Sequence, residues 1–163
     1  MQLFVFLVDD HRLALPAAMV REIIAAVAVT PLPAAPRGIA GMIDVRGELA
    51  PVYDLRARFG RSMRRIRASE HFILASSSGR LVAIRADRAL DLLDVPDDDI
   101  TSPSGDDAYA NLAGVARLPD GLLLIQDLAA FLSESDERTL DEALADARTP
   151  AVRTPAAGTP APA

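Results

Sequence analysis

Three acidic residues lie where they could take part in phosphoryl transfer. Asp9 and Asp10 follow a continuously apolar run at residues 3–8, and Asp54 ends a second apolar segment. Paired carboxylates at the end of a strand are suitable oxygen ligands for Mg²⁺, and a third carboxylate nearby could accept a phosphoryl group. The pattern therefore raises phosphate transfer to Asp54 as a hypothesis.

The remaining sequence argues against this phosphate chemistry. The spacing of the acids is similar to that of two-component receiver domains, but receivers also use a Lys, and all 17 cationic side chains of this chain are Arg. A receiver also needs a helix and a parallel strand between its acids. Here that interval contains the proline-rich residues 30–36 and a glycine-centred hairpin. Asp9 and Asp10 are better interpreted as a polar hairpin turn.

Other catalytic and metal-binding patterns are missing from the sequence. The chain has no Cys, and its two histidines, His11 and His71, do not form a paired ligand motif. A GxSxG nucleophile motif is also absent. We therefore expect no catalytic residue, no metal site and no cofactor. The rival hypothesis is a small-molecule or phosphate-binding enzyme that uses Asp54, Arg56 and His71.

Composition limits the partners and the compartment. The formal net charge is -6 and the pI is about 4.8, so electrostatic attraction to nucleic acid is unfavourable for the chain as a whole. The N-terminus lacks the basic lead of a signal peptide, and no segment has the roughly 20 apolar residues of a membrane span. We expect a cytoplasmic protein that neither binds nucleic acid nor inserts into a membrane.

Short apolar runs separated by turn residues predict a mainly β domain, because this pattern is typical of small barrels and not of βαβ units. Asp54 is expected to cap a short helical turn that ends at Gly60, and Asp127 to open a helix that extends to about Leu144. Residues 17–28 permit a short helix that passes into a strand. Four hairpins are expected, with turns at residues 9–12, 46–47, 76–80 and 119–121.

The other segments are expected to be loops or tail. Residues 30–36 and 96–107 contain prolines or acidic residues and are predicted to be loops. Residues 61–67 are arginine-rich and are interpreted as a solvated, mobile loop, with phosphate binding as the less favoured alternative. Residues 149–163 contain only Thr, Pro, Ala, Val, Arg and Gly. They are predicted to be a disordered tail that follows an ordered domain at residues 1–148.

The segment GMIDVRGELAPVYDLRARFG at residues 41–60 closely resembles the signature of CheW-like domains, commonly G-x-x-N-x-R-G-x-x-x-P-[VI]-x-D-L. Asp44 departs from this pattern, where Asn is usual, and adds charge beside Arg46. The resemblance covers about residues 2–132. It extends to residues 20–23, 79–87, 90–93 and 128–132.

This resemblance implies two small five-stranded SH3-like barrels that share a core, with short helices and a C-terminal helix. It also implies a non-enzymatic adaptor that couples the cytoplasmic tip of a chemoreceptor to the regulatory domain of a CheA-type histidine kinase. The protein would then be recruited from the cytoplasm to membrane receptor arrays. A CheW-like scaffold of a non-flagellar pathway is the alternative.

The resemblance also assigns roles to particular positions. Positions associated with kinase binding are matched by Gly41 and Ile23, and positions linked to receptor coupling by Val20, Glu22, Arg46 and Leu92. Glu22 and Arg46 are further expected to form an ion pair on the signalling face, because neither side chain has to enter the core. A bulky residue at Gly41 is expected to weaken kinase binding while leaving the fold largely intact.

Overall fold

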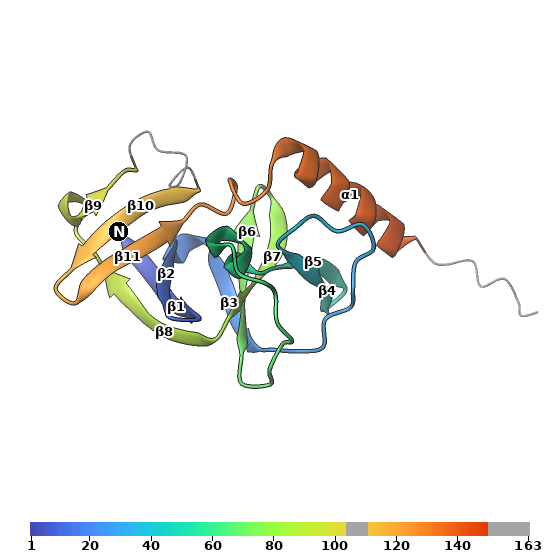
Figure 1. Ribbon diagram of the computed structural model, residues 1–163, viewed down its shortest axis with the longest axis horizontal. Helices are drawn as coiled ribbons and strands as arrows, with labels where there is room; N and C mark the ends of the chain where they lie inside the picture. The colour runs from blue at the N-terminus through green and yellow to red at the C-terminus, as the bar shows by residue number, and fades with distance from the viewer. Residues whose placement is uncertain (104–110, 150–163) are drawn as a thin grey trace, which may run out of the picture.

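Two β-sheets make up most of the computed structural model, which describes residues 1–103 and 111–149 (Figure 1). The first sheet has the order β8-β1-β2-β11-β10-β9, and the second has the order β3-β6-β7-β5-β4. The strands of the first sheet are β1 (Gln2–Val8), β2 (His11–Pro16), β8 (Arg88–Asp94), β9 (Ile100–Thr101), β10 (Leu112–Leu118) and β11 (Gly121–Gln126). Those of the second are β3 (Val20–Ala25), β4 (Ile39–Val45), β5 (Glu48–Tyr53), β6 (His71–Ser77) and β7 (Arg80–Ala86).

The hairpins predicted from the sequence join β1 to β2, β4 to β5, β6 to β7 and β10 to β11. Two of their turns, Arg46-Gly47 and Ser78-Gly79, have positive φ at both positions. This is the backbone geometry that a two-residue type I′ turn requires, and Gly adopts it without strain. Local turn chemistry therefore sets the register of these hairpins.

Longer connections close each sheet toward a barrel. Parallel pairing joins β2 to β11 in the first sheet and β5 to β7 in the second. In the second sheet the chain after β3 returns to β4, where the backbone N–H groups of Thr30 and Met42 donate to each other's carbonyl oxygens at 2.9 and 2.8 Å. The Thr30–Met42 bridge therefore joins the two edges of that sheet.

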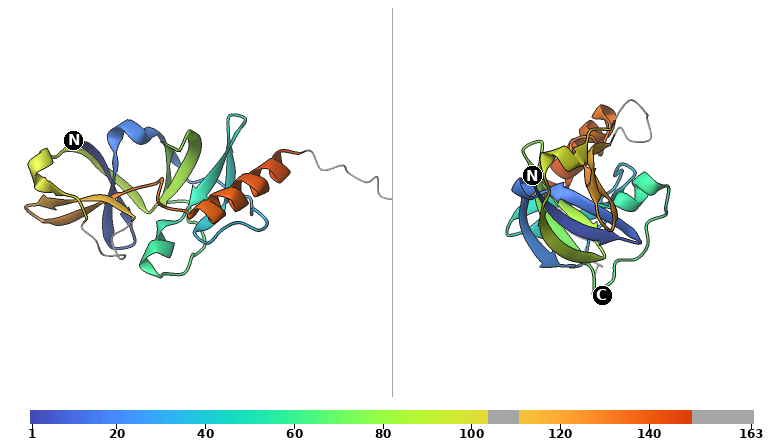
Figure 2. Two further views of the ribbon diagram at one scale, coloured as in Figure 1. Left: turned by 90° about the horizontal axis from the view of Figure 1, so that it is seen from above. Right: turned by 90° about the vertical axis from the view of Figure 1, so that its left-hand side faces the viewer.

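A shared aliphatic core connects the two sheets, which follow one another along the long axis in Figure 2. The first sheet contributes Phe6, Val8 and Leu15, and the second contributes Ile73 and Ile84. Smaller apolar clusters fill the inside of each sheet separately. These observations confirm the predicted mainly β fold of two small barrels with a common core. The first sheet has six strands where five were expected, because the two-residue β9 pairs with β10.

The C-terminal helix begins later than predicted. Helix α1 (Glu134–Arg148) starts after Ser133, whose side chain accepts a hydrogen bond from the Asp136 backbone N–H. Asp127 instead accepts from the Ala129 backbone N–H and stabilises a local turn. The prediction that Asp127 opens the helix is wrong, because Asp caps turns and helices by the same short-range hydrogen bond. The helix buries Leu140 and its neighbours against the shared core.

Three 3₁₀ turns complete the described elements: η1 (Ala17–Met19), η2 (Leu55–Phe59) and η3 (Asp97–Asp99). Asp54 caps η2 and Gly60 ends it with a φ of 65°, as predicted. Residues 96–107 were expected to be a loop, but η3 and β9 occupy their first part. Residues 104–110 and most of the predicted tail, 150–163, lie outside the described residues.

Candidate protein-interaction site

An exposed ion pair joins the signature hairpin to β3. Arg46, at the tip of the β4–β5 turn, donates from Nη2 to Glu22 Oε2 at 2.6 Å, which confirms the predicted pairing. The side chain of Arg46 is 73% exposed and that of Glu22 is 40% exposed. The hydrogen bond and charge of Arg46 lower the pKa of the Glu22 carboxyl, and Glu22 raises the pKa of Arg46 in return. Both groups are therefore charged at neutral pH.

The turn that carries Arg46 is held by the residue that departs from the family pattern. Asp44 Oδ1 accepts a hydrogen bond from the Gly47 backbone N–H at 2.7 Å. The amide oxygen of Asn can accept the same bond, so Asp44 preserves the turn while adding a negative charge. The pair also borders a hollow of about 210 Å³ whose apolar lining includes Val45 and Leu74. The ion pair thus lies at an open end of the second barrel's interior.

The other predicted contact residues have different surroundings. Ile23 is next to Glu22 on β3 and is 40% exposed, but it points to the opposite face because side chains alternate along a strand. Val20 is only partly exposed and packs against the shared core. Leu92 is 51% exposed and lies on β8, an outer strand of the other sheet. The structure therefore brings Glu22 and Arg46 into contact and places Leu92 on a separate sheet.

Gly41 is a buried position in the seam of the second barrel, which is the line along which the Thr30–Met42 bridge joins the two edges of the sheet. Its φ is 147°, and a Cβ atom there would lie 2.4 Å from the Thr30 carbonyl oxygen and 2.6 Å from Val29 Cγ1. Both distances are shorter than real Cβ contacts, so a larger residue displaces the backbone that forms the Thr30–Met42 bridge. The expectation that a bulky residue at Gly41 leaves the fold intact is wrong. Its assignment to kinase binding remains a prediction.

Two of the three acids that suggested phosphate chemistry, Asp9 and Asp54, come together around an arginine, whereas Asp10 is exposed. Arg56 donates to Asp9 at 3.0 Å, to Asp54 at 3.2 Å and to Asp87 at 2.7 Å. The side chain of Asp54 is fully buried and that of Arg56 is 1% exposed. Burial alone would raise the pKa of Asp9, but the hydrogen bond and charge of Arg56 outweigh it and hold that pKa below its usual value. The carboxylates of Asp9 and Asp54 are therefore paired with a guanidinium inside the protein.

Arg85 extends this buried network to the arginine-rich loop at residues 61–67. It donates to Asp54 at 3.1 Å and to both carboxylate oxygens of Glu70 at 2.8 and 3.1 Å. It also donates to the backbone carbonyls of Arg64 and Arg65 at 2.6 and 3.0 Å. Ion pairs from Arg64 to Asp87 and from Arg61 to Asp9 hold the loop further. Most of residues 61–67 are exposed, as the interpretation of a solvated loop predicts, but these contacts tie the loop to the rest of the protein.

This geometry argues against the site that the rival enzyme hypothesis requires. Asp54 and Arg56 are paired with each other inside the protein, and His71 starts β6. The other histidine, His11, stacks on Phe59 with ring centroids 4.0 Å apart. Within residues 1–103 and 111–149, no group of three or more His, Asp or Glu side chains is arranged to hold a metal ion. No helix of the described part of the chain is long and apolar enough to cross a membrane.

Comparisons with known proteins agree with this fold and signature. The CheW-like domain family matches residues 2–136. Protein FrzA of Myxococcus xanthus is 34% identical over 118 residues, covering 71% of this chain and 74% of FrzA. Chemotaxis protein CheW of Rhizobium meliloti is 33% identical over 135 residues, covering 83% of this chain and 84% of that protein.

A solved structure gives the same result for the fold. The crystal structure of scaffolding protein TtCheW from Thermoanaerobacter tengcongensis superposes with a TM-score of 0.75 at 24% sequence identity. The superposition covers 83% of this chain and 94% of TtCheW. With the family match over residues 2–136, these similarities show that the chain belongs to the CheW-like family.

Proposed function

We propose that this protein is a non-enzymatic adaptor that couples a chemoreceptor's cytoplasmic tip to the regulatory domain of a CheA-type histidine kinase. Membership of the CheW-like family supports the scaffold role, and the names of three relatives include chemotaxis. In this proposal the protein is cytoplasmic and is recruited to receptor arrays at the membrane. The observation that carries the proposal is the exposed ion pair between Glu22 and Arg46.

This pair is suited to recognition because it contributes little to folding. Exposed ion pairs stabilise proteins weakly, since water screens the charges and side-chain entropy opposes a fixed geometry. Arg46 uses Nη2 to bind Glu22, and its other guanidinium N–H groups stay available to a partner. Glu22 therefore fixes the direction in which Arg46 presents these donors to a carboxylate or carbonyl of the receptor or kinase.

Exposed apolar side chains supply the second part of the proposed interface. Ile23, Leu90 and Leu92 are 40%, 39% and 51% exposed, although they lie on ordered strands. Large apolar side chains at protein interfaces bury their area against a partner. We assign Ile23 to the kinase contact and Leu92 to receptor coupling. Val20 supports β3 from the core side, and Gly41 keeps the adjacent seam closed.

Reconstitution with a receptor fragment and the kinase tests this role. Kinase autophosphorylation should rise when the protein is added and should fail to rise with Arg46→Ala. Arg117→Ala is the matched control, because Arg117 is an exposed arginine on β10. Normal activation by a folded Arg46→Ala variant would contradict the role of the pair. Failure of the unmodified protein to bind either partner would contradict the adaptor function itself.

The pathway is identified by its kinase. Purification of the protein from its own cells, followed by identification of the bound kinase and receptor, separates flagellar chemotaxis from a non-flagellar scaffold role. Identification of the bound kinase is decisive because this chain is similar both to FrzA and to a CheW protein.

A further inference from the structure

The turn η2 follows β5 of the second sheet, but its side chains reach the first sheet. Arg58 donates from Nη1 to Gln126 Oε1, at the end of β11, at 2.7 Å. The ring of Phe59 stacks on that of His11, at the start of β2, with centroids 4.0 Å apart. Leu55, the first residue of the turn, is fully buried in the shared core. The turn η2 therefore lies at the junction of the two barrels.

Arg58 holds the end of the β10–β11 hairpin that is opposite its tight turn. Besides Gln126, it donates to the carbonyl of Asn111, just before β10, and to that of Asp127, just after β11, both at 2.9 Å. Its guanidinium carbon lies 4.8 Å from the centre of the Phe131 ring. Burial lowers the pKa of Arg58 to about 10, and the group is still charged at neutral pH. A planar guanidinium with several partners fixes the direction of each contact.

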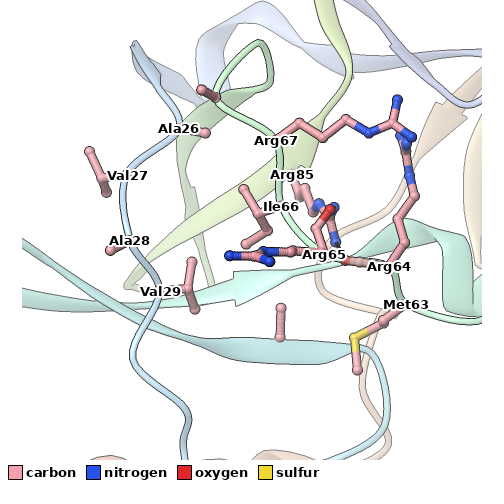
Figure 3. Close-up of a pocket in the computed structure, with 12 residues that line it drawn as sticks. Ala26, Val27, Ala28, Val29, Met63, Arg64, Arg65, Ile66, Arg67 and Arg85 are labelled. Carbon is pink, nitrogen blue, oxygen red and sulfur yellow. Dashed lines mark hydrogen bonds between the residues drawn. The ribbon is translucent and has the colours of Figure 1, made fainter.

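One face of the arginine-rich loop joins the same junction. Figure 3 shows the guanidinium groups of Arg64 and Arg67 side by side, on the opposite side of the loop from Arg65. Arg64 pairs with Asp87, which connects β7 to β8, and its Nη2 lies 3.6 Å from Asp9 Oδ1 in the β1–β2 turn. The face with Arg65 borders a hollow of about 590 Å³ that is lined by the second sheet and its loops. The junction therefore lies on the Arg64 side of the loop.

The contacts of η2 are of a kind that fixes an angle. The shared core holds the barrels together, but the hydrophobic effect is non-directional and does not by itself set their relative orientation. Hydrogen bonds and ring stacking, in contrast, depend on direction as well as distance. The side chains of η2 therefore restrict the orientation of one barrel on the other.

This orientation matters because the proposed contact residues lie on different sheets. Ile23 lies on β3 and Arg46 in the β4–β5 turn of the second sheet, whereas Leu92 lies on β8 of the first. When two linked sites bind together, the second binding event gains an effective concentration that depends on the geometry between the sites. An adaptor of this kind thus needs a fixed angle between its barrels.

We propose that Arg58 and Phe59 are positioning residues that fix the angle between the barrels at which the receptor and the kinase bind together. This inference rests on the proposed adaptor function. Both side chains are engaged inside the protein, so they act through the orientation of the contact residues. Loosening either one should leave the binding of each partner alone intact and should weaken their joint assembly.

Pulsed electron spin resonance tests the geometry in the protein alone. The chain has no Cys, so Glu48→Cys/Leu122→Cys places one spin label at an exposed position on each sheet. The labelled pair should give a narrow distance distribution. Arg58→Gln and Phe59→Leu should each broaden or shift it. Phe59→Tyr keeps a ring on His11 and should leave it unchanged, as should the control Arg117→Gln on the outside of β10.

Binding and activation test the consequence. Arg58→Gln and Phe59→Leu should bind the kinase regulatory domain alone, and the receptor fragment alone, as tightly as the unmodified protein does. Receptor-dependent kinase activation should nevertheless fall by about tenfold or more in each variant, because the two sites no longer meet their partners in one geometry. Phe59→Tyr and Arg117→Gln should activate normally.

Three results would overturn the positioning role. The first is an unchanged distance distribution in both Arg58→Gln and Phe59→Leu. The second is a broadened distribution with normal activation. The third is loss of binding to a single partner, because the side chain would then be a contact. If the unmodified protein binds neither partner, the adaptor function fails and the positioning role with it, whereas the distance measurement tests the geometry of the junction independently.

Discussion

The exposed Glu22–Arg46 pair and the buried network around Arg56 and Arg85 use the same chemistry in opposite environments. Arg46 is 73% exposed and makes one ion pair, whereas Arg85 is 1% exposed and all its described polar contacts are inside the protein. Water screens the first pair, so its contribution to folding is small. In the buried network, removal of one partner leaves a charge that neither water nor protein compensates. Burial therefore determines whether an arginine–carboxylate pair stabilises the fold or is free for recognition.

Arg85→Met gives the largest expected effect on stability. The substitution leaves Glu70 and Asp54 buried with fewer partners and releases two backbone carbonyls of the loop. We expect a loss of about 3 to 5 kcal/mol in the free energy of unfolding, measured by urea denaturation. Arg117→Met, at an exposed site, is the control. Equal stability of the two variants would remove the distinction between the buried network and the surface.

Gly41→Ala extends the comparison between buried and exposed positions to a single hairpin. Gly41 is buried in β4, and the same strand leads into the exposed turn that carries Arg46. The added methyl group meets the Thr30 carbonyl oxygen and Val29. We expect a loss of about 1 to 3 kcal/mol, typical of overpacking. Gly47→Ala is the paired variant, since an added Cβ there meets no atom within 4 Å and only the positive φ is unfavourable. A larger loss at Gly47 would contradict the assignment of Gly41 to a closed seam.

Acid should weaken the buried network before it affects the barrel interiors. The pKa of Asp9 is lower in the folded protein than its usual value of 3.8. Its contribution to stability is therefore present above the unfolded-state pKa and is lost as the pH falls through the folded-state pKa. Urea unfolding at about pH 5 and about pH 3 should show a larger loss for the unmodified protein than for Asp9→Asn. Identical losses would show that Asp9 does not contribute through its charge.

Arg46→Ala has the smallest expected effect on folding and a large one on coupling. Its thermal midpoint should stay close to that of the unmodified protein, because the pair is exposed. Receptor-dependent kinase activation should fall by about tenfold or more if Arg46 is a central contact. The double reversal Glu22→Arg/Arg46→Glu should restore the ion pair without restoring activation, because the partner then meets the opposite charge. Full activation by the double reversal would show that pairing alone is required.

Long-range packing accounts for what the sequence did not predict. Arg56 contacts Asp9 across 47 positions and Arg85 contacts Asp54 across 31, and no local pattern links such distant residues. The start of α1 after Ser133 was missed for a different reason. Both Asp127 and Ser133 carry capping side chains, and in the structure Asp127 caps a local turn while Ser133 caps the helix.

Features that depend on short-range chemistry, in contrast, could be predicted directly from the residues. Positive-φ glycines, capping acids and apolar runs predicted the hairpins, η2 and the mainly β class, because these depend on neighbours within a few positions. The signature also located Arg46 at an exposed turn. Only the tertiary structure decided that Asp54 is enclosed and that Gly41 has no room for a side chain. Burial and contact are properties of segments brought together by folding, and the local sequence does not contain them.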